Sequence, residues 1–345
     1  MSLTGHRQAS IEVILLDSSE RGKGRLDGVE GGEVSMSAGS RLRTSGTLNL
    51  VDRGQEIDWA KDRVKIVYKL ASGESWPLGV FLFASPKMSY SEGGSSLQVE
   101  LISKLSLLDG DAFVAAYQTV PSNHPLAHVR HLLTDVSPVN ISDGGPMLTS
   151  SMVWDAGTPK LTAINDILQA IGFWSLTVGA GGAFEASPYV EPLRRAKVWD
   201  FVEGENAIHL ADFTREQDLA AIPNRYICVS QGSGEKAGFV GYAENRDPAS
   251  PASYQARGRW VSKVETGVEA ANQQVITDLA KRRLAAASGA VGKIEIQHLP
   301  LPLAPNDLVG YRSGGVSVLA TVQETRIQLE PTALQTTTLK EVGRW

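Results

Sequence analysis

Apolar and polar residues alternate with a period of two through much of the first hundred residues of this chain. Residues 47–51, 64–68 and 97–101 follow this pattern, and residues 11–16 form a short apolar run. Alternation with this period buries one face of a strand and leaves the other in water, as in an antiparallel sheet. Glycine and serine turns separate the strands, so the pattern predicts a β-barrel or sandwich over residues 1–110. Pro77 lies inside a strand-like stretch, which predicts an edge strand or a β-bulge there.

A helical period replaces this alternation after residue 110. One apolar stripe consists of Pro125, Leu126, Val129, Leu132 and Leu133. A second helix is predicted with Thr158 as its cap, Pro159 in its first turn and Gly172 just beyond its end, and its apolar face holds Leu161, Ile164, Leu168 and Ile171. Residues 173–178 and 183–186 then predict a hairpin. Residues 111–195 therefore form an α+β segment.

Strand signals return at residues 226–230, 238–244 and 260–265. Thr266 and Glu269 have capping-box spacing, which predicts a long helix from there to Ser288, ended by Gly289. Further strands are predicted at residues 293–298, 308–311, 316–329 and 334–340. No internal repeat is visible. The sequence predicts an α+β fold that is mainly β, with strand-rich ends and helices between them.

Composition excludes several classes of protein. Cys228 is the only cysteine among 345 residues, so an internal disulfide framework, a cysteine zinc site and a CxxC redox centre are excluded. The net charge is −5 without a basic cluster, which argues against broad binding of phosphate backbones. The longest apolar run, residues 76–84, is too short to span a membrane, and the first residues do not form a signal peptide. We expect a soluble protein made in the cytoplasm.

Three histidines offer the first candidate site. His124, His128 and His131 lie within eight residues, and His128 and His131 would share a helix face. Zinc can use that spacing, but it needs further ligands from elsewhere, and no HExxH motif is present. A polar rim on an amphipathic helix is the favoured interpretation.

Nucleophilic and acid–base candidates are equally sparse. Cys228 is expected on a strand, on one face with Tyr226 and Ser230, where a small inert residue fits better than a nucleophile. A glycan hydrolase needs two carboxylates across a cleft, and the sequence-local candidates are Asp52, Glu56, Asp58, Asp62, Asp109 and Asp111. There is no Walker A or Gly-x-Ser-x-Gly motif, and the seven tryptophans are scattered. The residues predict no catalytic, cofactor or metal site and favour a structural or binding protein.

Four stretches carry a family resemblance. They are Trp76-Pro77-Leu78-Gly79-Val80-Phe81-Leu82, Val153-Trp154-Asp155-Ala156-Gly157-Thr158, Thr214-Arg215-Glu216-Gln217-Asp218-Leu219 with Ile222-Pro223-Asn224-Arg225, and Tyr254-Gln255-Ala256-Arg257-Gly258-Arg259-Trp260. In this order they resemble the tail-hub, or minor tail, proteins of long-tailed phages that infect actinobacteria. This group is similar in fold to the baseplate hubs of other tailed phages. The resemblance covers residues 10–340.

The resemblance implies an architecture. It divides the chain into a first β-barrel (1–110), an α+β middle domain (111–195), a discontinuous second β-barrel (196–235 and 295–345) and an α+β insert (236–294). Some related hubs carry a lytic extension, whereas this chain is expected to lack one because it stops at Trp345. No individual contact residues follow from the resemblance.

The resemblance also implies a function and partners. A homotrimer whose subunits each offer two related barrels would match a sixfold tail tube to a threefold tip. The expected partners are the distal tail or tube ring above, the tape-measure protein in the lumen, and a central fibre or spike and other minor tail proteins below. DNA would pass without specific binding, since an acidic lumen repels phosphates. The expected place is the virion tail tip, with no cofactor, membrane insertion or enzymatic activity. A tail-borne glycan hydrolase and a host receptor-binding module are the alternatives.

Overall fold

The computed structural model describes residue 3 and residues 7–91, 94–216, 222–230, 238–288 and 292–342. Residues 9–103, called the first half below because they form one of two strand-rich parts, make seven strands: β1 (Ala9–Leu16), β2 (Gly22–Arg25), β3 (Val29–Ser37), β4 (Thr44–Val51), β5 (Arg63–Leu70), β6 (Ser75–Ser91) and β7 (Gly94–Ser103). They pair antiparallel in the order β2–β1–β5–β6–β7–β4–β3. The period-two alternation at the start of the chain therefore predicted the right kind of structure.

The long strand β6 bends the first half. Its first part pairs with β5 and its second part with β7, and the register shifts between Phe83 and Pro86. A second shift, between Ile66 and Val67 of β5, lies opposite Pro77 and Gly79. Pro77 therefore marks a β-bulge. At Pro77 β6 pairs only with β5, because its pairing with β7 begins at Phe81, so this part of the strand is also an edge of the ladder.

The middle segment follows the first half and packs two helices over short strands. Its elements are α1 (Ser106–Asp109), β8 (Tyr117–Gln118), α2 (Pro125–Leu132), β9 (Val139–Ile141), β10 (Val153–Trp154), α3 (Lys160–Ala170), β11 (Thr177–Val178), β12 (Phe184–Ala186) and the 3₁₀ turn η1 (Pro192–Arg194). Both apolar stripes predicted for its helices are buried. The start of α3 differs from the prediction, since Pro159 occupies the cap position in place of Thr158. Gly172 follows the last turn with φ +78°, a backbone conformation that favours glycine.

Residues 197–216 and 293–341, called the second half below, form the other strand-rich part: β13 (Lys197–Val202), β14 (His209–Glu216), β18 (Lys293–His298), β19 (Leu308–Ser313), β20 (Val316–Gln328) and β21 (Gln335–Glu341). Strand β20 pairs with β3 of the first half, so that Ile327 lies opposite Val34. The two halves thereby join into one sheet of thirteen strands, and the pairings among the described strands do not close it into a ring.

The insert lies between β14 and β18 of the second half. It contains β15 (Arg225–Ser230), β16 (Val240–Glu244), α4 (Tyr254–Arg257), β17 (Ser262–Val268) and α5 (Gln273–Ser288). The capping box predicted at Thr266 and Glu269 is wrong, because β17 continues to Val268. Helix α5 begins after Asn272, whose side-chain oxygen accepts the backbone N–H of Val275 at 3.0 Å. Gly289, predicted to end this helix, lies outside the described residues.

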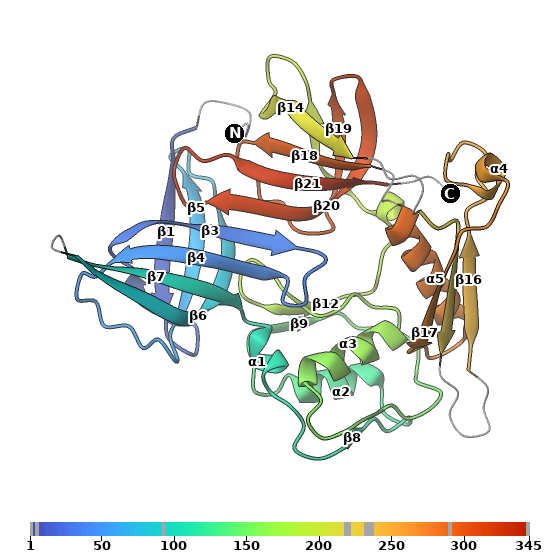
Figure 1. The fold of residues 1–345 in the computed structure, drawn as a ribbon. Helices are drawn as coiled ribbons and strands as arrows, with labels where there is room; N and C mark the ends of the chain where they lie inside the picture. The colour runs from blue at the N-terminus through green and yellow to red at the C-terminus, as the bar shows by residue number, and fades with distance from the viewer. Residues whose placement is uncertain are drawn as a thin grey trace.

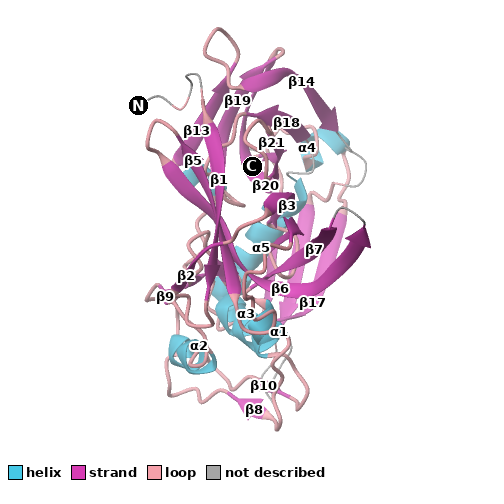
Figure 2. Ribbon diagram, turned by 90° about the vertical axis from the view of Figure 1, so that its left-hand side faces the viewer, coloured by secondary structure: helices cyan, strands magenta, loops and turns pink. Residues whose placement is uncertain are grey.

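Figure 1 shows the first half at the left, the second half at the top, the middle segment below and the insert at the right. The turned view in Figure 2 keeps the second half at the top and α2 and α3 at the bottom. Four clusters of buried apolar residues follow these four parts of the chain. Ile327 and Leu329 of the second half pack into the first-half cluster, so the cores meet where β20 pairs with β3. The fold is α+β and mainly β, which confirms the predicted class.

Candidate functional site

Two of the three histidines serve local structure, while His131 is exposed on α2. His128 is buried and so is not part of a polar rim. Its Nε2 accepts the backbone N–H of Val120 at 3.1 Å, and its Nδ1 lies 2.9 Å from the hydroxyl of Tyr117. His124 is the N-cap of α2 and accepts the backbone N–H of Leu126. Within the described residues, no three His, Cys, Asp or Glu side chains are grouped as a metal would need.

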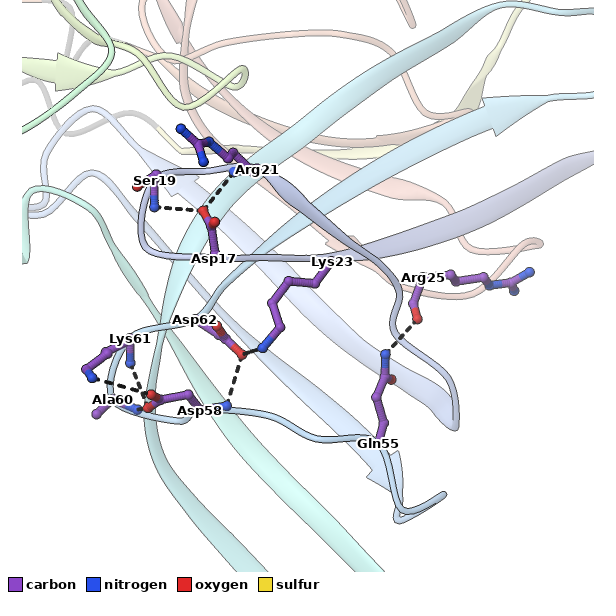
Figure 3. Close-up of polar contacts among 10 residues, drawn as sticks. All are labelled: Asp17, Ser19, Arg21, Lys23, Arg25, Gln55, Asp58, Ala60, Lys61 and Asp62. Atoms are coloured by element: carbon purple, nitrogen blue, oxygen red, sulfur yellow. Dashed lines mark hydrogen bonds and ion pairs between the residues drawn. The ribbon is translucent and has the colours of Figure 1, made fainter.

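The carboxylates between β4 and β5 support turns and two ion pairs, Lys23–Asp62 and Lys61–Asp58 (Figure 3). Asp62 is buried, lies 2.6 Å from Nζ of Lys23 and accepts the backbone N–H of Asp58 at 2.9 Å. The carboxylate of Asp58 accepts the backbone N–H groups of Ala60 and Lys61. These contacts hold the loop against the β1–β2 hairpin, whose own turn is fixed by Asp17 in the same way.

The remaining predicted carboxylates lie on the surface. Asp52 accepts the backbone N–H of Gly54 at 2.8 Å, and Glu56 is exposed in the same loop. Asp109 pairs with Arg41 and Asp111 pairs with Lys160. A glycosidase acid needs a carboxyl whose pKa is raised, usually by an apolar site. Exposed and ion-paired carboxylates do not provide such a site.

A pair that the sequence analysis missed comes closer to this requirement. Asp166 on α3 is half-buried and accepts the indole N–H of Trp154 at 2.8 Å. Burial raises the pKa of Asp166, and burial together with the Asp166 charge raises the pKa of Glu269. The two residues are about a hundred positions apart, so sequence spacing could not reveal them. Neither is among the described residues that line the two cavities at the Trp76–Trp174 junction and beside Trp59.

Cys228 is fully buried beneath α5, on the strand face predicted for it. Burial raises the pKa of its thiol to about 11. The thiolate, which is the reactive form, is therefore suppressed at neutral pH. Tyr226 and Ser230 are buried on the same face, as the alternation predicts.

A cavity lies where three parts of the chain meet. Its volume is about 590 Å³, and its walls include Arg43 and Trp76 of the first half, Trp174 of the middle segment and Leu303 and Gln335 of the second half. The described walls include the hydroxyls of Ser175, Thr177 and Ser187 and the carboxylates of Glu185 and Asp307, and none of these hydroxyls is hydrogen-bonded to one of these carboxylates. The cavity is a junction between parts of the chain.

Arg195 braces one wall of this junction. Its Nη1 donates to the carbonyl oxygen of Asn306 at 2.7 Å, and its Nε donates to that of Val190 at 2.8 Å. The guanidinium carbon lies 4.9 Å from the ring centre of Trp174, within the range of a cation–π contact. Burial lowers the pKa of Arg195. These contacts fix the middle segment to the second half.

Lys104 links the middle segment to the first half of the chain. Its side chain is fully buried at the end of the first half and contacts the carboxylate of Glu20. Its Nζ also donates to the carbonyl oxygens of Ser137 at 2.9 Å and Gly182 at 2.6 Å, so its three donors have three acceptors. A lysine inside an apolar run, Leu101 to Leu108, was the sequence signal for this site. It would have indicated a paired, buried charge.

No described helix is long and apolar enough to cross a membrane. No protein-family model matches the chain, and no curated protein matches it. Solved structures do match. A tail protein from Neisseria meningitidis aligns with a TM-score of 0.67 and 13% identity, covering 97% of this chain and 98% of its own. The 43 kDa tail protein of prophage MuSo2 from Shewanella oneidensis aligns with a TM-score of 0.69 and 10% identity, covering 96% and 98%.

A third match comes from a secretion system. A type VI secretion component of Escherichia coli, described as structurally similar to phage T4 tail proteins, aligns with a TM-score of 0.52 and 9% identity. The alignment covers 99% of this chain and 76% of that protein. At such low identities the likeness concerns the fold. The architecture is therefore that of phage tail proteins.

Proposed function

We propose that this chain is a structural component of a phage tail, and within the tail the hub of its tip. The end-to-end similarity in fold to tail proteins is the observation that carries this proposal. It spans both strand-rich halves, the middle segment and the insert. A shared catalytic domain or a single binding module would have matched only part of the chain.

The four apolar clusters support four domains. We infer a first hub domain at 1–110, a middle domain at 111–195, a second hub domain at 196–235 with 295–345, and an insert at 236–294. Most members of each of the first three clusters come from one of these ranges, whereas Tyr226 and Cys228 of the fourth cluster come from β15, inside 196–235, so the core of the insert extends to that strand. A contiguous apolar core is the usual physical mark of a domain.

The hub proposal includes a symmetry. Three copies, each with two related strand-rich halves, would form a ring that offers six similar surfaces to the tail tube and three to the tip. Tape-measure protein and then DNA would pass through its lumen, and a net charge of −5 disfavours DNA binding. The tube ring would lie above, and the fibre or spike and other minor tail proteins below. The motifs favour a phage of actinobacteria, with synthesis in the host cytoplasm.

A non-enzymatic role fits the described side chains. The carboxylates predicted as a possible acid pair are exposed or engaged by cations and turn amides. Wall cleavage would then belong to another tail protein. A turbidity assay on host cell walls tests this part separately, and clearing by the purified chain would contradict it.

Electron cryo-microscopy of intact particles tests the hub itself. Three copies in a closed ring below the last tube ring are the expected result. Copies on peripheral fibres, or a number that is not a multiple of three, would contradict the proposal and favour a receptor-binding module.

A further inference from the structure

The insert presents an apolar sheet face to solvent. Strand β15 lies between β16 and β17, and Ile227 is directly opposite Tyr242 on one side and Val264 on the other. Tyr242 is 60% exposed and Val264 is 57% exposed. The next row adds Val240, which is 51% exposed and opposite Val229. Large apolar residues are therefore exposed on β16 and β17, with the half-buried Ile227 and Val229 of β15 between them.

The opposite face of this sheet is already covered. Helix α5 packs so closely on it that a Cβ at Gly241 would lie 2.5 Å from the backbone of Ile276. The same helix also reaches the middle segment, since Nη1 of Arg282 donates to the carbonyl oxygen of Phe173 at 3.2 Å. Helix α5 thus lies between the sheet and the rest of the molecule, and the apolar face points outward (Figure 1).

One end of the apolar face is cationic. The guanidinium carbon of Arg225 lies 3.8 Å from the ring centre of Trp260, and that of Arg246 lies 5.0 Å from it. A single carboxylate, Glu244, is shared by both arginines at 2.7 Å. The face therefore combines exposed aliphatic and aromatic groups with an excess of positive charge. Tryptophan, tyrosine and arginine are the residues that dominate binding energy in protein interfaces.

A second surface of the same chain has the complementary character. Residues 202–212 comprise the end of β13, the connection 203–208 and the start of β14, and they contain three acids, Glu203, Glu205 and Asp212, without a lysine or arginine. Val202 and Leu210 in this segment are 39% and 45% exposed. The segment therefore offers apolar groups together with negative charge.

We propose that the outer face of the insert sheet binds the 202–212 segment of a second copy of this chain. The proposal rests on the trimer of the proposed function and names the surfaces that build it. Two different patches on one chain make a head-to-tail contact, which closes into a ring when the rotation permits. Figure 1 shows β14 at the top and the insert at the right, so the two patches face different neighbours. Charge complementarity sets which patch meets which.

The area of the apolar face limits how much of the interface between two copies it can supply. Three strands of about five residues cover roughly 250 Å², because strands are about 4.8 Å apart and rise about 3.3 Å per residue. A stable interface needs about 800 Å² from each partner. The sheet face is therefore the apolar centre of a larger contact and not the whole of it.

Sedimentation of the purified full chain and of one variant tests the apolar face. Val264→Asp places a charge on this face beside Ile227, and Val153→Asp is a matched control because Val153 on β10 is 59% exposed elsewhere. We expect the Val264→Asp chain to dissociate at a concentration at least tenfold higher than wild type, with an unchanged melting temperature. The Val153→Asp chain should assemble like wild type.

A charge exchange tests the pairing of the two patches. Arg246→Glu and Glu205→Arg should each weaken assembly about tenfold, and the double variant should recover to within threefold of wild type. A wild-type trimer that both Val264→Asp and the charge variants leave intact would overturn these surfaces while the trimer stands. Wild-type chain that is monomeric at every concentration would contradict the trimer itself. Recovery absent in the double variant would refute the assigned partner segment.

Discussion

Replacing Lys104 by methionine tests whether one buried ammonium group holds the first half against the middle segment. The side chain is fully buried, and its three donors reach the carboxylate of Glu20 and the carbonyl oxygens of Ser137 and Gly182. Methionine fills a similar volume and adapts its shape, so packing is largely retained. The variant therefore isolates the loss of the donors.

The expected cost follows from these acceptors. Breaking a buried ion pair by removing one partner costs about 3–5 kcal/mol, because the remaining charge is left without compensation. Glu20 keeps a second partner, since Nη1 of Arg63 lies 3.0 Å from its carboxylate. The lower end, about 3 kcal/mol, is therefore expected. At about 1.4 kcal/mol per factor of ten, this raises the opening equilibrium of the boundary on the order of 100-fold.

Hydrogen exchange read by mass spectrometry measures that opening locally. Backbone amides of residues 134–142 and 179–186 should lose about two orders of magnitude of protection in Lys104→Met. The protection of the backbone amides of β15 in the insert should not change. Lys61→Met is the control, because the Lys61 side chain is 75% exposed and its nearest carboxylate oxygen is 3.9 Å away. Protection in Lys104→Met within threefold of wild type would refute the structural role of the ammonium.

Three further predictions concern single residues. Burial lowers the pKa of His298 from 6.5 to about 4, so the unfolded state binds the proton more readily. Stability measured by urea unfolding should fall by about 3 kcal/mol as pH falls from about 6.5 to 4, and His298→Gln should flatten that dependence. Gly241→Ala should lower the free energy of unfolding by about 1–3 kcal/mol, because α5 must move to make room for the new Cβ. Gly22→Ala should leave the free energy of unfolding nearly unchanged in the same assay, because the space around its Cβ is open. Cys228 should react with a thiol reagent at pH 8 only after denaturation, and rapid labelling of the native chain would contradict its burial.

Local structure was predictable wherever a periodic pattern extended over a whole element. The stripe from Pro125 to Leu133 gave α2 correctly because its apolar residues all face one core. The alternation in β5 and β7 was equally direct, since each strand has one face in the core of the first half. The capping box predicted at Thr266 and Glu269 was wrong for a physical reason. The two residues have capping-box spacing, but the pairing of β17 with β15 holds Thr266 and Val268 in extended backbone.

Contacts between distant segments were not predictable. The pairing of Ile327 with Val34, the ring stacking of Arg195 and the closeness of Asp166 to Glu269 all join residues that no local pattern relates. Lys104 was a partial exception, since a charge in an apolar run implies a buried partner. The sequence could not identify Glu20 as that partner, because the contact forms only when the turn after β1 folds back to the end of β7.

The β3–β20 pairing also explains how a subunit with two strand-rich halves could serve a ring. Each subunit would have to present two similar surfaces to a sixfold tube, so the angle between its halves would need to be fixed within the subunit. A ladder of backbone hydrogen bonds fixes that angle better than a side-chain contact would, because the whole stretch Glu33–Ser37 lies in continuous antiparallel register with β20. Lys104 and Arg195 then tie the middle segment to each half in turn. Rigidity within the subunit would leave the interfaces between copies as the places where the assembly can adjust.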